Sequence, residues 1–183
     1  RKDFRTLRGW VQTWIRRYGG GAGPGWTPRL AGRRLARLGP AAGRLLAEAS
    51  GSESRMLRRS IAAHLRFLRA RHAAEDDIVA RIEAASGLLI GALSVEGHRG
   101  ARQTGKRALA ALADPVGDDG SVEQRRPDAM AAMFVHLAWT AQALEAAGEA
   151  PLPAHAAALK RLGPAVRALR LGDGGLPRFH GGD

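Results

Sequence analysis

The sequence of 183 residues contains no cysteine, which excludes disulfide bonds and zinc sites built on thiolates. Long apolar runs are also missing. The most apolar stretch, 84–97, is shorter than the roughly 20 residues that a membrane-spanning helix needs, and it contains glutamate and glycine. Alternation of apolar and polar residues, which is typical of a half-buried strand, is almost absent. These absences exclude a membrane span and favour an all-α fold.

Lysine is scarce although the chain is strongly basic. Lysine and arginine together number 29 against 17 acidic residues, a formal net charge of +12, yet the only lysines are Lys2, Lys106 and Lys160. Arginine binds carboxylate, sulfate and phosphate through two parallel hydrogen bonds, which lysine cannot do. Such a charge attracts nucleic acid, anionic membranes or acidic polysaccharides, and charge alone does not choose among them. A GC-rich coding sequence would also explain the excess of arginine.

Apolar residues recur at helical spacing through most of the chain. The pattern predicts one helical domain over 1–183, in which short turns make successive helices antiparallel hairpins. The segments lie near 4–18, 28–38, 51–68, 75–93, 99–113, 127–144 and 159–169, with a weaker one at 41–49.

Several helix ends are marked by their residues. Thr27 followed by Pro28 predicts a capped helix start, and Ser50 with Glu53 fits a capping box. Gly39-Pro40 predicts the end of a helix, because proline has no N–H to donate within a helix.

Arg34 is the first candidate binding residue. At helical spacing it shares a face with Leu30, Ala31, Leu35 and Leu38. An unpaired guanidinium is costly to bury, so we expect Arg34 to meet a carboxylate, backbone carbonyls or an anionic ligand. A structural ion pair within the protein is the alternative to a ligand.

The longest polar break, 114–126, supplies the next candidates. It carries Glu123, Arg125 and Arg126 directly before a helix that starts at Pro127. Free N–H groups and the helix dipole favour anions at such a start, and two arginines add to this. The alternative is a solvated loop with surface ion pairs.

The end of the chain holds Arg178, Phe179 and His180 among glycines. A cation, an aromatic face and a titratable ring together suit a sugar acid, with His180 as the candidate for proton transfer and Arg178 for carboxylate binding. A frayed terminus is the alternative.

Metal and cofactor sites are not expected. None of the histidines belongs to an HExxH or HxxxH pair, and no carboxylate lies at ligand spacing from one. The glycine-rich stretch 19–25 lacks the Lys-Ser/Thr of a phosphate-binding loop and is interpreted as a flexible connection.

Four stretches together resemble the amino-terminal helical domain of heparinase II/III-like proteins of the alphaproteobacterial type. They are 23–38 (GPGWTPRLAGRRLARL), 84–93 (AASGLLIGAL), 118–130 (DDGSVEQRRPDAM) and 159–182 (LKRLGPAVRALRLGDGGLPRFHGG). The resemblance covers most of the chain in order, and its most distinctive part is the last stretch.

This resemblance implies an incomplete (α/α) toroid, a ring of helical hairpins followed in the whole polypeptide by a β-sandwich domain. It also implies a polysaccharide lyase of the periplasm or cell envelope. Such an enzyme cleaves an acidic, uronate-containing polysaccharide by β-elimination: a base removes the proton beside the carboxylate, cationic groups neutralise that carboxylate, and an acid protonates the leaving oxygen.

The sequence departs from the family at the catalytic positions. Characterised members carry Asn-Asn-His before the helix that matches 82–89, whereas acidic residues stand there in this chain. Their tyrosine and histidine after the Asp-Gly-Ser turn are replaced, and the only tyrosine is Tyr18 in the first helix. We therefore expect the base and acid to come from the rest of the protein or to be absent.

Two other functions remain open. The chain is alternatively a non-catalytic relic that binds acidic carbohydrate. A nucleic-acid-binding domain ranks last, because the arginines are spread over many helices and no recognition-helix signature is present.

Overall fold

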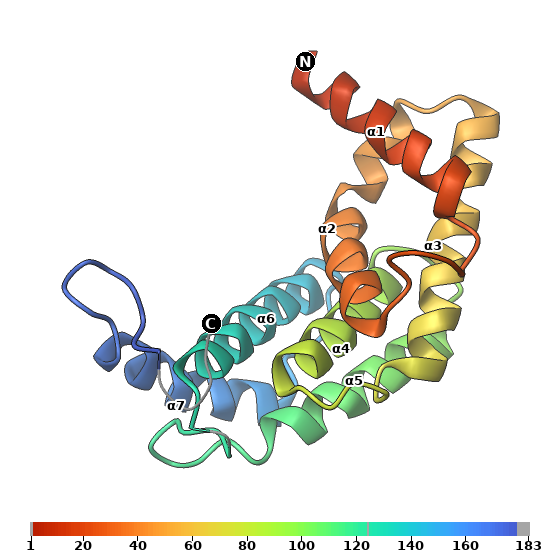
Figure 1. Ribbon diagram of the computed structural model, residues 1–183. Coiled ribbons are helices and arrows are strands. Elements are labelled where there is room, and N and C mark those ends of the chain that lie inside the picture. The colour runs from red at the N-terminus through yellow and green to blue at the C-terminus, as the bar shows by residue number, and fades with distance from the viewer. Residues whose placement is uncertain (1, 124, 179–183) are drawn as a thin grey trace.

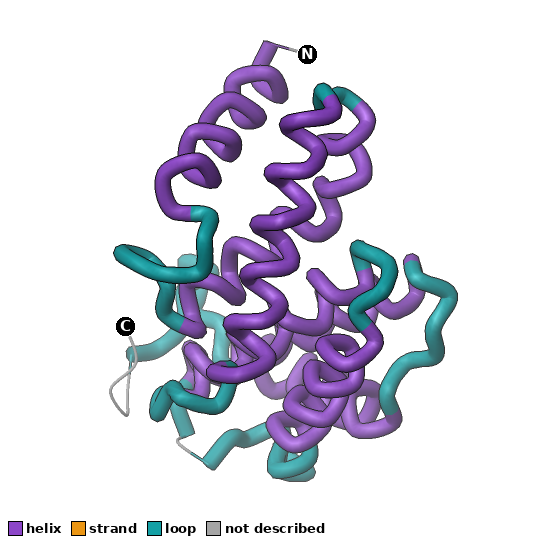
Figure 2. Tube along the Cα trace, turned by 90° about the vertical axis from the view of Figure 1, so that its right-hand side faces the viewer, coloured by secondary structure: helices purple, strands orange, loops and turns teal. Residues whose placement is uncertain are grey.

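The computed structural model describes residues 2–123 and 125–178. This part of the chain consists of helices and loops, without a strand (Figures 1 and 2). The seven helices are α1 (Lys2–Tyr18), α2 (Pro28–Ala47), α3 (Gly51–Arg71), α4 (Ile78–Leu93), α5 (Arg99–Ala113), α6 (Pro127–Ala146) and α7 (Pro153–Ala168). The prediction of an all-α protein is confirmed. None of these described helices has the length and apolar character required to span a membrane.

Local capping explains where several helices begin. The Thr27 side chain accepts a hydrogen bond from the Leu30 N–H, at 3.2 Å. At the start of α3, the Ser50 N–H donates to the Glu53 carboxylate, at 2.7 Å, and the Glu53 N–H donates to Ser50 Oγ. Both predicted starts are therefore confirmed, because each depends on residues within one turn.

The predicted helix end at Gly39-Pro40 is wrong. α2 continues through Pro40 to Ala47, so that the weaker segment 41–49 belongs mostly to the same helix. Pro40 cannot donate to the Ala36 carbonyl, and an interior proline destabilises a helix by about 3 kcal/mol. However, Ala42 and Leu45 beyond it are buried in the core, and burial of such side chains offsets the cost.

α4 is the central helix. It packs against α2, α3, α5 and α6, and 13 of its 16 residues are buried. Consecutive helices run antiparallel in the pairs α2–α3, α4–α5 and α6–α7 (Figure 1). A helix covered on nearly all sides must be apolar all round, which accounts for the unusual hydrophobicity of this segment.

α2 crosses α4 with their backbones in direct contact. A Cβ atom added to Gly87 of α4 would overlap the backbone of Gly32 in α2, and one added to Gly32 would overlap the backbone at Glu83 and Ala84. Glycine at both positions thus allows an approach that any larger residue would prevent.

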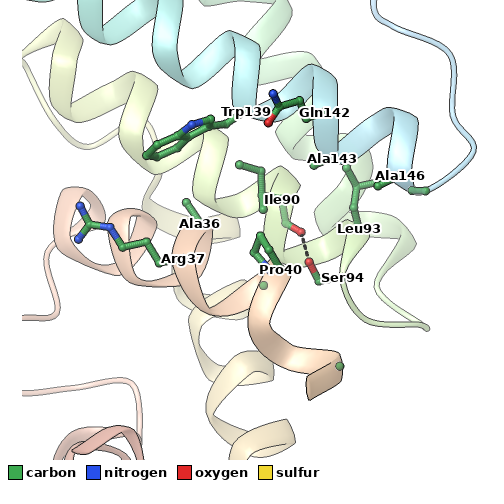
Figure 3. Close-up of a pocket in the computed structure, with 13 residues that line it drawn as sticks. Ala36, Arg37, Pro40, Ile90, Leu93, Ser94, Trp139, Gln142, Ala143 and Ala146 are labelled. Atoms are coloured by element: carbon green, nitrogen blue, oxygen red, sulfur yellow. Dashed lines mark hydrogen bonds between the residues drawn. The ribbon is translucent and has the colours of Figure 1, made fainter. Parts of the chain in front are cut away.

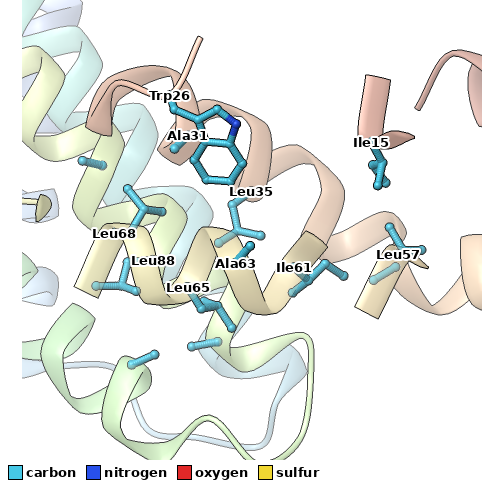
Figure 4. Packing of buried hydrophobic residues seen from close by; sticks show 14 of the residues in the cluster. Ile15, Trp26, Ala31, Leu35, Leu57, Ile61, Ala63, Leu65, Leu68 and Leu88 are labelled. Carbon is cyan, nitrogen blue, oxygen red and sulfur yellow. The ribbon is translucent and has the colours of Figure 1, made fainter. Parts of the chain in front are cut away.

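The buried apolar residues form two clusters that meet at α4. The first lies between α1, α2, α3 and α4 and includes Leu35, Leu65, Leu68 and Leu88 (Figure 4). The second lies between α4, α5, α6 and α7 and includes Leu89, Leu109, Met133, Leu137 and Leu162. Adjacent residues of α4, Leu88 and Leu89, therefore belong to different clusters.

Candidate functional site

A groove of about 700 Å³ lies between α2, the end of α4 and the second half of α6 (Figure 3). Its apolar part includes Pro40 and Ile90, and its polar groups include Arg37 and Gln142. The indole of Trp139 lines the groove and remains 41% exposed. Concave sites with an apolar lining and a few polar groups are the usual form of a ligand site.

Three arginines follow one face of α2 beside this groove. Arg29, Arg33 and Arg37 are spaced four residues apart, so their side chains lie along the same face of the helix. Arg29 Nε donates to Glu83 Oε2 at 2.8 Å, and Arg33 Nε lies 3.8 Å from Glu83 Oε1. Within the described part of the chain, Arg37 makes no hydrogen bond or ion pair. One carboxylate thus pairs with two of the three guanidinium groups, which leaves an excess of positive charge along this face of α2.

Glu83 pairs with both Arg29 and Arg33 and is only 7% exposed. Its hydrogen bond to Arg29, together with its negative charge, raises the pKa of that guanidinium despite partial burial. Leaving a buried carboxylate without a partner is costly, so Arg29 is committed to Glu83. Arg33 shares the same carboxylate at 3.8 Å, and Arg37 is the cation of the row that remains available to a ligand within the described residues.

His136 of α6 contacts Glu83, joining α6 to these charged residues. Its Nε2 lies 3.9 Å from Glu83 Oε1, and its ring meets Trp139 edge to face, with the centroids 5.4 Å apart. Burial, reinforced by the charges of Arg33 and Arg37, lowers the pKa of His136 to about 4. The ring is therefore neutral at pH 7, so its contact with Glu83 is not an ion pair. His136 instead packs against Trp139.

Arg126, which was predicted to bind an anion, is already paired. Its Nη1 lies 2.7 Å from Asp77 Oδ1 and its Nη2 lies 2.5 Å from Asp128 Oδ2. Hydrogen bonds to Asp128 and then Asp77 raise the pKa of Arg126 above its usual value. Because Asp77 caps α4 and Arg126 immediately precedes α6, this guanidinium joins two helix starts.

The other predicted binding residues, Glu123, Arg125 and Arg178, are exposed to solvent. Arg125 is exposed, has a φ of 49°, and lines a shallow cavity of about 530 Å³ with Ser121 and residues of α7. Glu123 is exposed beside a small separate cavity, and Arg178 is exposed beyond the end of α7. His180 lies outside the described residues.

Arg34 does lie among apolar residues, but within the described part of the chain it pairs with neither a carboxylate nor a backbone carbonyl. Its guanidinium lies over two indole rings, with Cζ 4.4 Å from the ring centroid of Trp14 and 5.4 Å from that of Trp26. Its Nε donates a hydrogen bond to His64 Nε2 at 3.2 Å. The opposite ring nitrogen of His64 donates to the Ser60 carbonyl at 2.8 Å, which leaves Nε2 as the acceptor. Burial lowers the pKa of Arg34 to about 10. The cation is held by aromatic faces, an arrangement that stabilises the fold.

The predicted site residues therefore fall into separate places. Glu123, Arg125 and Arg126 adjoin the second apolar cluster, whereas Arg34 belongs to the first. None of the cavities described here is lined by both Arg34 and Arg125. The sequence analysis missed the residues around Arg33, Arg37, Glu83 and Trp139, although the spacing of the arginines by four residues and the single carboxylate within 78–93, Glu83, were visible signals.

No model of a known protein family matches the chain, and no curated protein or solved structure is significantly similar to it. Within residues 2–123 and 125–178, no group of three or more His, Asp or Glu side chains is arranged to hold a metal ion. The interpretation of the site depends on its own geometry and charge.

Proposed function

We propose that this chain binds an acidic, uronate-containing polysaccharide along the groove between α2 and α6. The observation that carries the proposal is the row of three arginines on one face of α2: two share the carboxylate of Glu83, and the third, Arg37, lines the groove with the exposed Trp139. Arg37 can hold a sugar carboxylate through paired hydrogen bonds, with Arg33 one turn away on α2, while the Trp139 ring offers an apolar face to a pyranose. The net charge of +12 attracts such a polymer from a distance.

We further propose that the chain is the helical domain of a polysaccharide lyase of the heparinase II/III-like type. In β-elimination, neutralising the carboxylate makes the neighbouring proton removable, and Arg37 in the groove is suited to that step. The base and acid would come from His180 or from the rest of the polypeptide. The incomplete (α/α) toroid, the following β-sandwich and a periplasmic or envelope location belong to this proposal and depend on the resemblance of the four sequence stretches.

One observation favours the second candidate, binding without turnover. Among the described residues that line the groove, Arg37 is the only one with an ionisable side chain, so no general base or acid lines it. The nearest histidine, His136, is buried and neutral. A relic of a lyase that retains its substrate but does not cleave it would have such a groove.

Chromatography on immobilised polygalacturonate tests the binding proposal. We expect R33Q/R37Q to elute at clearly lower salt than the wild type, and Trp139→Ala to show a smaller shift. The control is R66Q/R107Q, which removes the same charge from exposed arginines of α3 and α5. Equal elution of the two double variants would contradict the groove site, and stronger retention on duplex DNA at the same salt would favour nucleic acid instead. Thermal melts verify that each variant is folded.

Activity of the full-length protein separates the lyase from the relic. Cleavage by β-elimination produces an unsaturated uronate whose ultraviolet absorbance rises with time. A rise that is lost in R37Q supports the lyase. Retention on the column without any rise, for every acidic polysaccharide tried, supports the binding relic.

A further inference from the structure

A second cationic cavity lies away from the groove, between the end of α1 and the first half of α3. It has a volume of about 360 Å³ and is lined by Gly19, Ser52, Arg55, Arg59 and Ser60, with Ile15 and Met56 as its apolar part. Among the described residues, no carboxylate lines this cavity. Arg55 and Arg59 are four residues apart on α3, so both guanidinium groups lie on the same side of the helix.

These two arginines are not committed elsewhere. In the described part of the chain, neither makes an ion pair or a hydrogen bond, unlike Arg29 and Arg126. Glu53, the nearest carboxylate in sequence, accepts hydrogen bonds from the Ser50 N–H and from Gln12 instead. Two like charges one helical turn apart repel each other, which an anion between them would relieve.

Ser60 provides an independent sign that this cavity is a ligand site. It is only 2% exposed, it lines the same cavity, and its buried Oγ has no hydrogen-bond partner among residues 2–123 and 125–178. A buried hydroxyl left unsatisfied costs about 1–3 kcal/mol. The Ser60 carbonyl is already occupied by His64 Nδ1, so its hydroxyl remains the free polar group.

We infer that this cavity binds a tetrahedral oxyanion, a sulfate or phosphate group. Two guanidinium groups and one hydroxyl supply donors to several oxygens at once, and a tetrahedral anion has enough oxygens to accept from all three. The group arrives either as the free inorganic ion or as a monoester on a sugar. The cavity is formed by α1 and α3, so the inference does not depend on the α2–α6 groove.

Titration calorimetry and thermal melts of the whole chain test the site with sodium sulfate and sodium phosphate, against sodium chloride at the same ionic strength. We expect sulfate or phosphate to raise the melting temperature above chloride, and R55Q/R59Q to lose this difference. The matched control is R58Q/R66Q, which removes two exposed arginines of the same helix that do not line the cavity. Loss of the effect in both double variants overturns the inference, as does stabilisation by neither the inorganic oxyanions nor glucosamine 6-sulfate beyond that by chloride.

Ser60→Ala gives a second measurement that does not depend on the arginine variants folding. Without oxyanion we expect its stability to equal or exceed that of the wild type, because the unpaired hydroxyl is gone. Its affinity for the anion should fall about tenfold, the effect of losing a hydrogen bond to a charged group. Unchanged affinity overturns the site. Binding of inorganic sulfate identifies the free ion as sufficient, whereas binding of glucosamine 6-sulfate but not of the inorganic ions or unsulfated glucosamine identifies the ester.

Discussion

Three buried histidines of this protein differ in the partners of their ring nitrogens. His64 uses both nitrogens, one toward the Ser60 carbonyl and one toward Arg34. His136 leaves Nδ1 without a partner, and His155 leaves both nitrogens without one within the described residues. Burial is the main cause that lowers the pKa of each ring to about 4. All three are neutral in the folded protein at pH 7.

This neutrality predicts acid sensitivity. The folded-state pKa values near 4 lie below the ordinary value of 6.5, so the unfolded chain binds more protons between these limits. The stability contributed by the neutral rings is fully present above about pH 6.5 and is lost progressively as the pH falls toward about 4. Urea unfolding at a series of pH values measures it. A free energy of unfolding that stays constant over this interval would contradict the prediction.

His155 allows the same effect to be tested at one position. His155→Leu removes two unpartnered polar atoms from a buried site, so we expect the free energy of unfolding at neutral pH to rise by about 1 kcal/mol. The fall in stability below about pH 6.5 should also become shallower, because one titrating ring is gone. Calorimetric melts at two pH values provide the measurement. A less stable variant would instead show that the ring nitrogens bind partners such as water.

Arg34 shows the limit of sequence reasoning for a single residue. Helical spacing correctly placed it among apolar neighbours of its own helix, because that information is local. Its actual partners, Trp14, Trp26 and His64, come from α1, the loop before α2, and α3. Aromatic faces were not among the expected partners, and no local pattern indicates which distant side chains will meet.

At the scale of elements, the contact between α2 and α4 should tolerate no side chain. Gly87→Ala would force a methyl group into the backbone of Gly32, and we expect a loss of about 3 kcal/mol or more, because neither helix axis can yield cheaply. Chemical denaturation measures the change. Gly43→Ala on α2 is the matched control: no atom lies within 4 Å of its new Cβ, so helix propensity should raise stability by about 0.5–1 kcal/mol. Equal effects of the two substitutions would contradict the close contact.

Helix starts were predictable whereas one helix end was not, and the reason is the range of the forces involved. Thr27 and Ser50 cap helices through atoms three residues away. The passage of α2 through Pro40 depends on Ala42 and Leu45 being buried in contacts made with other helices. The central place of α4 likewise depends on which helices cover it, although its uniform hydrophobicity was evident.

At the scale of the whole molecule, α4 couples the two apolar clusters. We predict that Leu88→Ala and Leu89→Ala, which truncate adjacent residues in different clusters, each cost about 2–5 kcal/mol and shift one common unfolding transition. Far-ultraviolet circular dichroism reports on all helices. In a Trp139→Phe background, tryptophan fluorescence reports only on Trp10, Trp14 and Trp26 in the amino-terminal part. Different midpoints from the two probes would show that the clusters unfold separately.

The candidate site is also a property of the whole molecule, because its residues come from helices far apart in the sequence. For this reason the sequence indicates only part of it. The excess of arginine predicted an anionic partner, since charge is a property of composition. The groove joins α2 to α6 residues about a hundred positions later in the chain (Arg37 and Trp139). Composition thus predicts the chemistry of a ligand but not where it would bind, and the loop that holds Arg126 does not reveal that this residue pairs with Asp77 and Asp128.

The two glycines at the α2–α4 crossing have a consequence for selectivity. α2 forms one wall of the groove, and its separation from the opposite wall depends on how closely its backbone rests on α4. If the groove binds a polysaccharide as proposed, a substitution at position 32 or 87 that the fold tolerates would hold α2 farther from α4 and change the width of the groove. Gly32 and Gly87, which do not line the groove, would then influence the thickness of the chain that it accepts.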